Sequence, residues 1–158
     1  GARHITLSTC GLVPKIKELS KFPLQVNLAI SLHAPNDDVR NEIMAINKVY
    51  NISQVIEVIS EYISVTNRRV TIEYVMLQGV NDQEEHALEL AQLLRGLNVY
   101  VNLIPYNETE NIGFKRTKKM QILAFYDILK KNGINVTIRK EFGSKVDAAC
   151  GQLRANQN

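Results

Sequence analysis

Residues 25–33, "QVNLAISLH", alternate between two kinds of side chain, and this alternation decides the fold. The apolar positions are Val26, Leu28, Ile30 and Leu32, and the positions between them are Asn27, Ala29, Ser31 and His33. Successive side chains of a β-strand point to opposite faces of the sheet. A parallel strand covered by helices on both faces is nearly all apolar. The stretch therefore predicts a sheet with one apolar face under helices and one polar face.

The same alternation returns in later strands. Five β-branched runs predict strands at 4–8, 25–33, 69–77, 99–106 and 134–140. Glu73, Asn102 and Thr137 fall on the polar side of the last three. Because helical stretches separate the runs, they indicate βα units and a mainly parallel α/β sheet. A solvated antiparallel face would also alternate, but the intervening helices favour a curved parallel sheet, part of a barrel, whose polar side holds a ligand.

The first two of these helical stretches carry recognisable caps. We expect Asn36 or Asp37 to cap the first helix. Ser53 is expected to cap the second, which has an apolar stripe along residues 55–63. Ser, Asn and Asp are favoured at this position because their side chains accept hydrogen bonds from free backbone N–H groups.

Two further helices are predicted over residues 82–96 and 117–133. The first begins with a capping-box pattern, Asp82 to Glu85, and ends near Gly96. The second ends at a glycine, as helices often do. The side chains that it is expected to bury are Met120, Leu123 and Phe125.

The composition is that of a soluble globular protein, with 45% hydrophobic and 22% charged residues. A length of 158 residues fits one domain. No apolar run approaches the roughly 20 residues that a membrane helix needs. The two cysteines, Cys10 and Cys150, make no disulfide framework, so we expect a reducing, cytoplasmic compartment. The abrupt start at Gly1 indicates a piece of a longer chain.

Basic residues gather in four places, although the net charge is only +3. The places are Arg68–Arg69, residues 115–119, Lys130–Lys131 and Arg139–Lys140. Such clusters can neutralise the phosphates of a nucleic acid. Solvated loops and helix ends account for them equally well, so charge alone leaves both interpretations open.

Small and polar residues follow the predicted strands, in "STCG", "SLHAPND", "LQGVND" and "PYNETEN". In α/β barrels the ligand lies at the carboxyl ends of the strands. Ser8, Ser31, His33 and Asn107 are therefore expected to converge on one site. For Ser8 or Asn107 taken alone, formation of a turn is the simpler role.

Five stretches together resemble the radical SAM adenine methyltransferases that act on RNA, the RlmN/Cfr family. They are "GARHITLSTCGLVPKI", "LAISLHAPND", "IEYVMLQGVND", "VNLIPYN" and "DAACGQL", in the order of the family. The resemblance implies the second half of a partial (β/α) radical SAM barrel over residues 1–140, with helices on its outer face, and a separate segment over 141–158. The form "SLHA" is closer to the RlmN branch, which methylates carbon 2 of adenine. The alternative is the Cfr branch, which methylates carbon 8 and confers antibiotic resistance.

The resemblance also implies which residues contact S-adenosyl-L-methionine (SAM). They are Ser8, Ser31, Leu32, His33 and Asn107, four of which the strand ends had already selected. Glu73 is expected to hydrogen-bond a SAM hydroxyl or amine, or to pair with Arg139. We interpret Cys10 as a small packed side chain, and His4 and His86 as surface or boundary residues.

Cys150 in "DAACGQL" stands where the family has its methyl-carrying cysteine. In the implied chemistry one SAM methylates this thiol. A second SAM, cleaved at a 4Fe–4S cluster, yields a deoxyadenosyl radical that takes hydrogen from the S-methyl group, and the carbon radical adds to adenine. A thiolate suits the first step because it is a strong nucleophile, and the small neighbouring residues leave it room. The alternative is a small buried cysteine.

Several family features are absent from this sequence. They are the cluster motif CxxxCxxC, the glycine-rich SAM segment and the second catalytic cysteine, so the chain holds no expected metal ligand and is expected to be inactive by itself. Ala45 stands where relatives have proline, and Lys145 and Val146 replace an acidic residue and isoleucine.

The expected RNA substrate is large-subunit ribosomal RNA, with transfer RNA as a second candidate. A half-barrel that binds RNA without chemistry is the alternative from a different class. An aldolase-like barrel enzyme is disfavoured because no lysine occupies an inward strand position. If an upstream strand is missing, the strand at 4–8 is an edge that we expect to self-associate or to pair with the chain's own tail.

Overall fold

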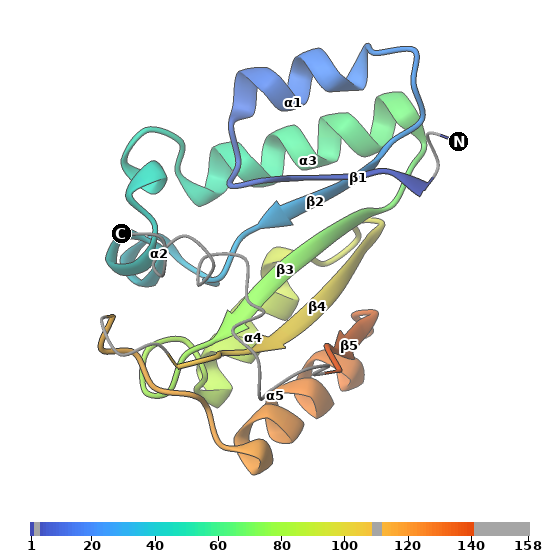
Figure 1. The fold of residues 1–158 in the computed structure, drawn as a ribbon. Helices are drawn as coiled ribbons and strands as arrows, with labels where there is room; N and C mark the ends of the chain where they lie inside the picture. Colours follow the sequence, from blue (N-terminus) through green and yellow to red (C-terminus); the bar gives the residue numbers. More distant parts are fainter. Residues whose placement is uncertain (2–3, 109–111, 141–158) are drawn as a thin grey trace.

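The computed structural model describes residues 1, 4–108 and 112–140 and shows one parallel sheet flanked by helices (Figure 1). The strands are β1 (Thr6–Thr9), β2 (Asn27–Ser31), β3 (Val70–Met76), β4 (Val99–Pro105) and β5 (Val136–Ile138). The helices are α1 (Val13–Ser20), α2 (Asp37–Ile43), α3 (Ile52–Thr66), α4 (Glu84–Leu93) and α5 (Lys119–Lys131), with a 3₁₀-helix, η2 (Ala45–Lys48). The segment 141–158, which includes Cys150, lies outside the described residues.

All five strands pair in parallel, in the order β1-β2-β3-β4-β5. Each strand lies beside the one before it because a helical connection returns the chain to the same end of the sheet. In Figure 1, α1 and α3 lie along β1 and β2, whereas α4 and α5 lie along β3, β4 and β5. The predicted α/β class and parallel sheet are confirmed.

The core lies between the sheet and these helices. Alternate residues of β3, from Val70 to Met76, are fully buried, and the residues between them are half-buried. β4 repeats the pattern over most of its length. The predicted alternation is therefore confirmed. Full burial of such an apolar side chain stabilises the fold by about 1.5–3 kcal/mol.

The caps of α2 and α3 show how closely a cap can be read from sequence. Asn36 caps α2, as predicted, and its Oδ1 accepts a hydrogen bond from the backbone of Val39 at 2.9 Å. α3 is capped by Asn51 and not by Ser53, so that prediction is wrong. Asn51 and Gln54 accept hydrogen bonds from each other's backbone N–H at 3.0 Å, which satisfies two donors that the helix leaves free.

α4 and α5 differ from their predictions in detail. The capping box of α4 joins Gln83 to His86, not Asp82 to Glu85, because the Asp82 side chain is buried and bonded elsewhere. On α5 the buried side chains are Ile122, Phe125 and Leu129. Met120 is 82% exposed and Leu123 is 42% exposed, so their predicted burial is wrong, whereas that of Phe125 is confirmed.

Candidate functional site

A row of polar side chains crosses four neighbouring strands. The register pairs Ser31 with Glu73, Glu73 with Asn102, and Asn102 with Thr137. Paired residues share one face of a sheet, and these four lie on the face opposite the buried apolar positions. All four are half-buried. Asn102 Nδ2 lies 3.4 and 3.5 Å from the two carboxylate oxygens of Glu73. The amide therefore orients the Glu73 carboxylate towards β4.

His33 lies just beyond the end of β2, beside this row. Its backbone has φ 59°, a left-handed conformation that is uncommon for a residue other than glycine. Three contacts hold it there: its N–H donates to the carbonyl of Glu73 at 3.3 Å, its carbonyl accepts from Asn81 Nδ2 at 2.8 Å, and its Nδ1 accepts from the N–H of Val75 at 3.0 Å. Because Nδ1 is an acceptor, the neutral ring carries its proton on Nε2.

Burial lowers the pKa of His33 from 6.5 to about 4, and the positive charge of Arg40 acts in the same direction. The backbone carbonyl of Glu73 opposes them. His33 is therefore neutral near pH 7, with Nε2–H as a donor for a ligand.

Arg40 is a buried hub behind the ends of β1 and β2. The side chain is fully buried, at 0% exposure. Its guanidinium donates hydrogen bonds of 2.7–3.4 Å to the carbonyl oxygens of Cys10, Ser31, Leu32 and Tyr50 and to Oδ1 of Asn47. Such a charge is costly unless its donors are satisfied. Here each of the five N–H groups has an acceptor, so Arg40 ties the two strand ends together.

Asn81 and Asp82 fix the loop after β3. Asn81 is fully buried, and its amide donates to the carbonyls of His33 and Val75 at 2.8 and 2.7 Å. Its Oδ1 accepts from the N–H of Leu77 at 2.7 Å. The buried carboxylate of Asp82 accepts from Thr117 Oγ1 at 2.9 Å, which joins this loop to the start of α5. The ends of β2 and β3 are thus held by side chains, and Asn81 supports His33 directly.

The five predicted SAM contacts occupy different environments. Ser31 is the first residue of the row, and His33 lies beside it, just beyond the end of β2. Ser8 is exposed and pairs with Ala29, which lies on β2 two residues before Ser31. Ser8 is therefore on the same face of the sheet as Ser31, nearer the amino ends of the strands. Leu32 is at 0% exposure in the apolar core, and its N–H and carbonyl bond to Glu73 and Arg40. Asn107 is exposed, two residues beyond the end of β4. Their roles as ligand contacts stay predictions.

Three of the other sequence predictions meet a definite outcome. Glu73 forms no ion pair with Arg139 among the described residues, so that alternative is wrong. His4 is exposed and His86 is half-buried, as expected for surface and boundary positions. Cys10 is half-buried, and its backbone carbonyl, which the sequence did not single out, is one of the oxygens that accept a hydrogen bond from Arg40.

Tyr106, between β4 and Asn107, carries a buried polar atom. Its hydroxyl is buried without a hydrogen-bond partner in the described part of the chain. Its ring packs edge-on against Phe114, with centroids 6.4 Å apart. A buried hydroxyl without a partner costs about 1–3 kcal/mol. Ser31, Glu73 and His33 offer hydrogen-bond donors and acceptors of the kinds that the ribose, amine and adenine groups of SAM require.

The described residues do not fit an iron–sulfur cluster. Over 1, 4–108 and 112–140, no three His, Cys, Asp or Glu side chains are grouped so that they could hold a metal ion. In the same ranges, no helix is both long enough and apolar enough to cross a membrane.

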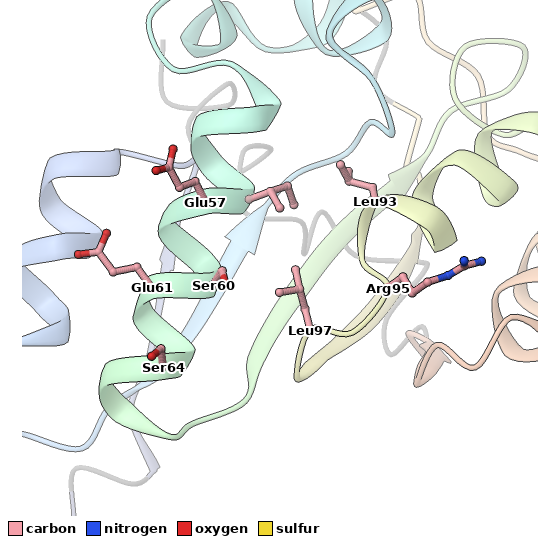
Figure 2. Close-up of a pocket in the computed structure, with 8 residues that line it drawn as sticks. Glu57, Ser60, Glu61, Ser64, Leu93, Arg95 and Leu97 are labelled. Atoms are coloured by element: carbon pink, nitrogen blue, oxygen red, sulfur yellow. The ribbon is translucent and has the colours of Figure 1, made fainter.

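A pocket of about 530 Å³ on the outer helical surface is not part of this arrangement (Figure 2). It lies between α3 and the turn that follows α4. In Figure 2, Glu57 and Glu61 of α3 point away from Arg95, on the opposite side. Glu61 is paired with Lys17 at 3.3 Å. The pocket is thus a groove between neighbouring helices, without side chains that converge on a ligand.

Known proteins resemble both the sequence and this geometry. The family model of the radical SAM superfamily matches residues 1–91. A probable dual-specificity RNA methyltransferase RlmN of Spiroplasma citri is 56% identical over 155 residues, which cover 98% of this chain and 44% of that protein. The corresponding protein of Enterococcus faecalis is 60% identical over 160 residues, covering 99% and 45%. A solved radical SAM methyltransferase from Sphaerobacter thermophilus matches with a TM-score of 0.94 and 50% identity, over 96% of this chain and 45% of that one.

The chain spans a little under half the length of these relatives. The family model covers more than half of the chain and includes β1, β2 and β3, which carry Ser8, Ser31 and Glu73. The resemblance predicted from the sequence is confirmed by the RlmN relatives. This chain belongs to the radical SAM superfamily.

Proposed function

We propose that this chain is part of a radical SAM methyltransferase that methylates carbon 2 of an adenine in large-subunit ribosomal RNA, with transfer RNA as an alternative substrate. The observation that supports this most is the polar row from Ser31 to Thr137, with neutral His33 beside it, in a chain 56–60% identical to RlmN relatives. The row crosses the middle of β3 and β4 and reaches the carboxyl end of β2 at Ser31, beside His33. Ligands of α/β barrels bind at the carboxyl ends of the strands, which is the end marked by Ser31 and His33.

SAM would lie along this row. The Nε2–H of His33 and the hydroxyl of Ser31 are donors for its adenine and ribose, and the carboxylate of Glu73 accepts from a ribose hydroxyl or the amine. Arg40 and Asn81 contribute indirectly, because they hold the backbone of Ser31 and His33 in place. When bound, SAM supplies an electrophilic methyl group to a nucleophile.

Cys150 is the proposed acceptor of that methyl group, a role that rests on "DAACGQL". Its thiolate would attack the methyl carbon; a carbon–sulfur bond forms, the sulfonium bond breaks, and S-adenosylhomocysteine leaves. Cys150 lies outside the described residues, so its position relative to the row stays a prediction.

The test uses the longer protein loaded with its iron–sulfur cluster. Cys150→Ala should abolish RNA methylation, and the extra methyl group that intact-mass analysis finds on the wild type should disappear. Cys10→Ala is the matched control, because it removes the second cysteine of these 158 residues but keeps the backbone carbonyl that binds Arg40. Turnover by Cys150→Ala would exclude the carrier role.

The position of the new methyl group separates the two branches. Nucleosides from digested RNA should contain 2-methyladenosine; 8-methyladenosine would instead assign the Cfr-like activity. RNA that is bound but never methylated by the longer, cluster-loaded protein would favour a non-catalytic RNA-binding half-barrel. The 158-residue chain alone should show no methylation and only weak SAM binding by calorimetry.

A further inference from the structure

A second pocket, of about 490 Å³, lies at the amino ends of β1, β2 and β3. Its lining residues are Thr6, Asn27, Arg68, Arg69 and Thr71. Thr6 and Asn27 are the first residues of their strands, whereas His33 lies just past the opposite end of β2. At about 3.3 Å per residue, the four steps from Asn27 to Ser31 along β2 span about 13 Å, and His33 lies beyond Ser31. The pocket is therefore at the end of the sheet remote from His33.

The two arginines are held over this pocket by neutral groups. Arg68 Nη2 donates to Oδ1 of Asn27 at 2.9 Å. The Arg69 guanidinium lies over the ring of Tyr100, 4.9 Å from its centroid. Thr71 pairs with Tyr100 in the register, so the ring belongs to the same face of the sheet. A hydrogen bond to an amide and a cation–π contact orient a guanidinium without neutralising its charge.

No carboxylate balances these charges in the described residues. The two ion pairs found there are Lys15–Glu18 and Lys17–Glu61, and neither involves the pocket. Glu73 lies two residues beyond Thr71 on the same face, but among the described residues it forms no ion pair with either arginine. Two adjacent positive groups in a polar pocket therefore create a local excess of positive charge.

The chemistry of the lining matches a phosphate group. A guanidinium presents a planar fork of N–H donors that fits two phosphate oxygens at once. The hydroxyls of Thr6 and Thr71 add neutral donors on the same side. A backbone phosphodiester has two non-bridging oxygens, which match one fork, whereas a terminal or free phosphate has three or four, enough for both.

We propose that Arg68 and Arg69, with Thr6 and Thr71, form a phosphate-binding site at the amino ends of the strands, separate from the polar row. The phosphate belongs either to an RNA strand or to a small free phosphate compound, and in both cases guanidinium N–H groups donate to its free oxygens. This proposal does not rest on SAM binding or methylation, so it can fail or succeed independently of the proposed function.

The first experiment follows the arginine side chains directly in the 158-residue chain. The Nε–H signals of Arg68 and Arg69 are monitored by NMR while inorganic phosphate, and separately a single-stranded RNA oligonucleotide, is added at low salt. Saturable shifts of these two signals, with Arg95 unshifted, support the site. Arg95 is a suitable reference because it is exposed on the outer surface. If neither probe shifts Arg68 and Arg69, or if Arg95 responds equally, the proposal is overturned.

The second experiment removes the charges. Arg68→Gln with Arg69→Gln is compared with Lys130→Gln and Lys131→Gln, a pair on α5 that loses the same charge. RNA affinity should fall about tenfold in the arginine variant and less than about twofold in the lysine variant. In the arginine variant, the slope of log K against log salt concentration should become smaller in magnitude by about 1. Equal losses in both variants would mean that only net charge matters and would overturn the site.

A third variant covers the case in which the double substitution unfolds the chain. Arg69→Lys keeps the charge but loses the planar fork. It should weaken phosphate binding while circular dichroism stays unchanged; undiminished binding would contradict the proposal. Shifts with inorganic phosphate but not with RNA would support the site and assign it to a small phosphate compound. Shifts with RNA would assign it to the nucleic-acid backbone.

Discussion

Arg40 Nη2 donates a 2.7 Å hydrogen bond to the carbonyl oxygen of Cys10, which lies thirty residues earlier in the chain. The bond joins α2 to the turn that follows β1. The same nitrogen also lies 3.4 Å from the carbonyl of Ser31, at the end of β2. One side chain thus sets the spacing of two strand ends, and it does so through backbone atoms that any residue possesses.

Replacement of Arg40 should therefore be costly. Arg40→Met keeps much of the volume but leaves the carbonyls of Cys10 and Leu32, among others, without their donor. Each buried group left unsatisfied costs about 1–3 kcal/mol, so we expect a loss of about 3 kcal/mol or more in the free energy of unfolding. Urea denaturation measures it. Arg95→Met, at an exposed arginine, should stay within about 0.5 kcal/mol, and similar losses in the two variants would contradict the hub.

Stability should depend on pH through His33. Its pKa in the folded chain, about 4, is below the value of 6.5 in the unfolded chain, so the unfolded state binds more protons between these values. The stabilisation is complete above pH 6.5 and is lost as the pH falls towards 4. From pH 6.5 to pH 5 the loss attributable to His33 is at most about 2 kcal/mol.

His33→Asn isolates this contribution from the carboxylates that titrate in the same range. Asparagine tolerates a positive φ, and its Oδ1 can take the place of Nδ1 as acceptor for Val75. Urea unfolding at pH 7 and pH 5 should show a smaller loss for the variant than for the wild type. Equal losses would mean that His33 is not protonated on unfolding in this range.

Gly11, beside Arg40, leaves no room for a side chain. It has φ +99°, and a Cβ added there would lie 3.0 Å from Cγ2 of Val55 and 3.5 Å from Nη2 of Arg40. Gly79 also has positive φ, +71°, but nothing within 4 Å of its Cβ position. Gly79→Ala should therefore cost only the backbone strain, about 1–2 kcal/mol. Gly11→Ala should cost measurably more in the same denaturation assay; equal costs would show that the neighbours yield freely.

The free edge of β1 should recruit another strand. Within the described residues β1 pairs only with β2, and Ile5 beside it is 56% exposed. We expect the 158-residue chain to self-associate through residues 4–8, or to pair this edge with its own tail. Sedimentation would detect the first outcome, and protection from hydrogen exchange at residues 4–8 would accompany either.

Ile5→Lys tests this edge, since charged side chains at a sheet edge oppose pairing. Val65→Lys is the control, because Val65 on α3 is 59% exposed, close to the exposure of Ile5. Only Ile5→Lys should reduce association or protection. A monomeric wild type whose amides at 4–8 exchange freely would show that water alone satisfies the edge.

The sheet and its polar face were predictable because a period of two residues reports directly which side chains share a face. Glu73 and Asn102 were placed by this rule, and the register confirms that they are paired. Helix α1 was not predicted, since its eight residues bury only Ile16 and Ser20 and give a weak pattern. The cap of α3 was misassigned because Asn51 and Ser53 are both good capping residues two positions apart.

Arg40 and Asn81 could not be identified from the sequence for a different reason. Their partners are mostly backbone carbonyl and N–H groups, which every residue type offers. A hydrophilic side chain with such partners looks no different in sequence from a solvated one. Only the arrangement of β1, β2 and β3 in space reveals that these carbonyls converge.

The polar row also helps to specify the register of the strands. If β3 slipped by one residue against its neighbours, every side chain would change face, and Glu73 would enter the layer now filled by Ile72 and Tyr74. An unpaired carboxylate there would cost several kcal/mol. The face proposed to hold a ligand thereby disfavours misaligned pairing of the strands as the chain folds. Replacing Glu73 with an apolar residue would remove a proposed ligand contact and would also lower the cost of a shifted register.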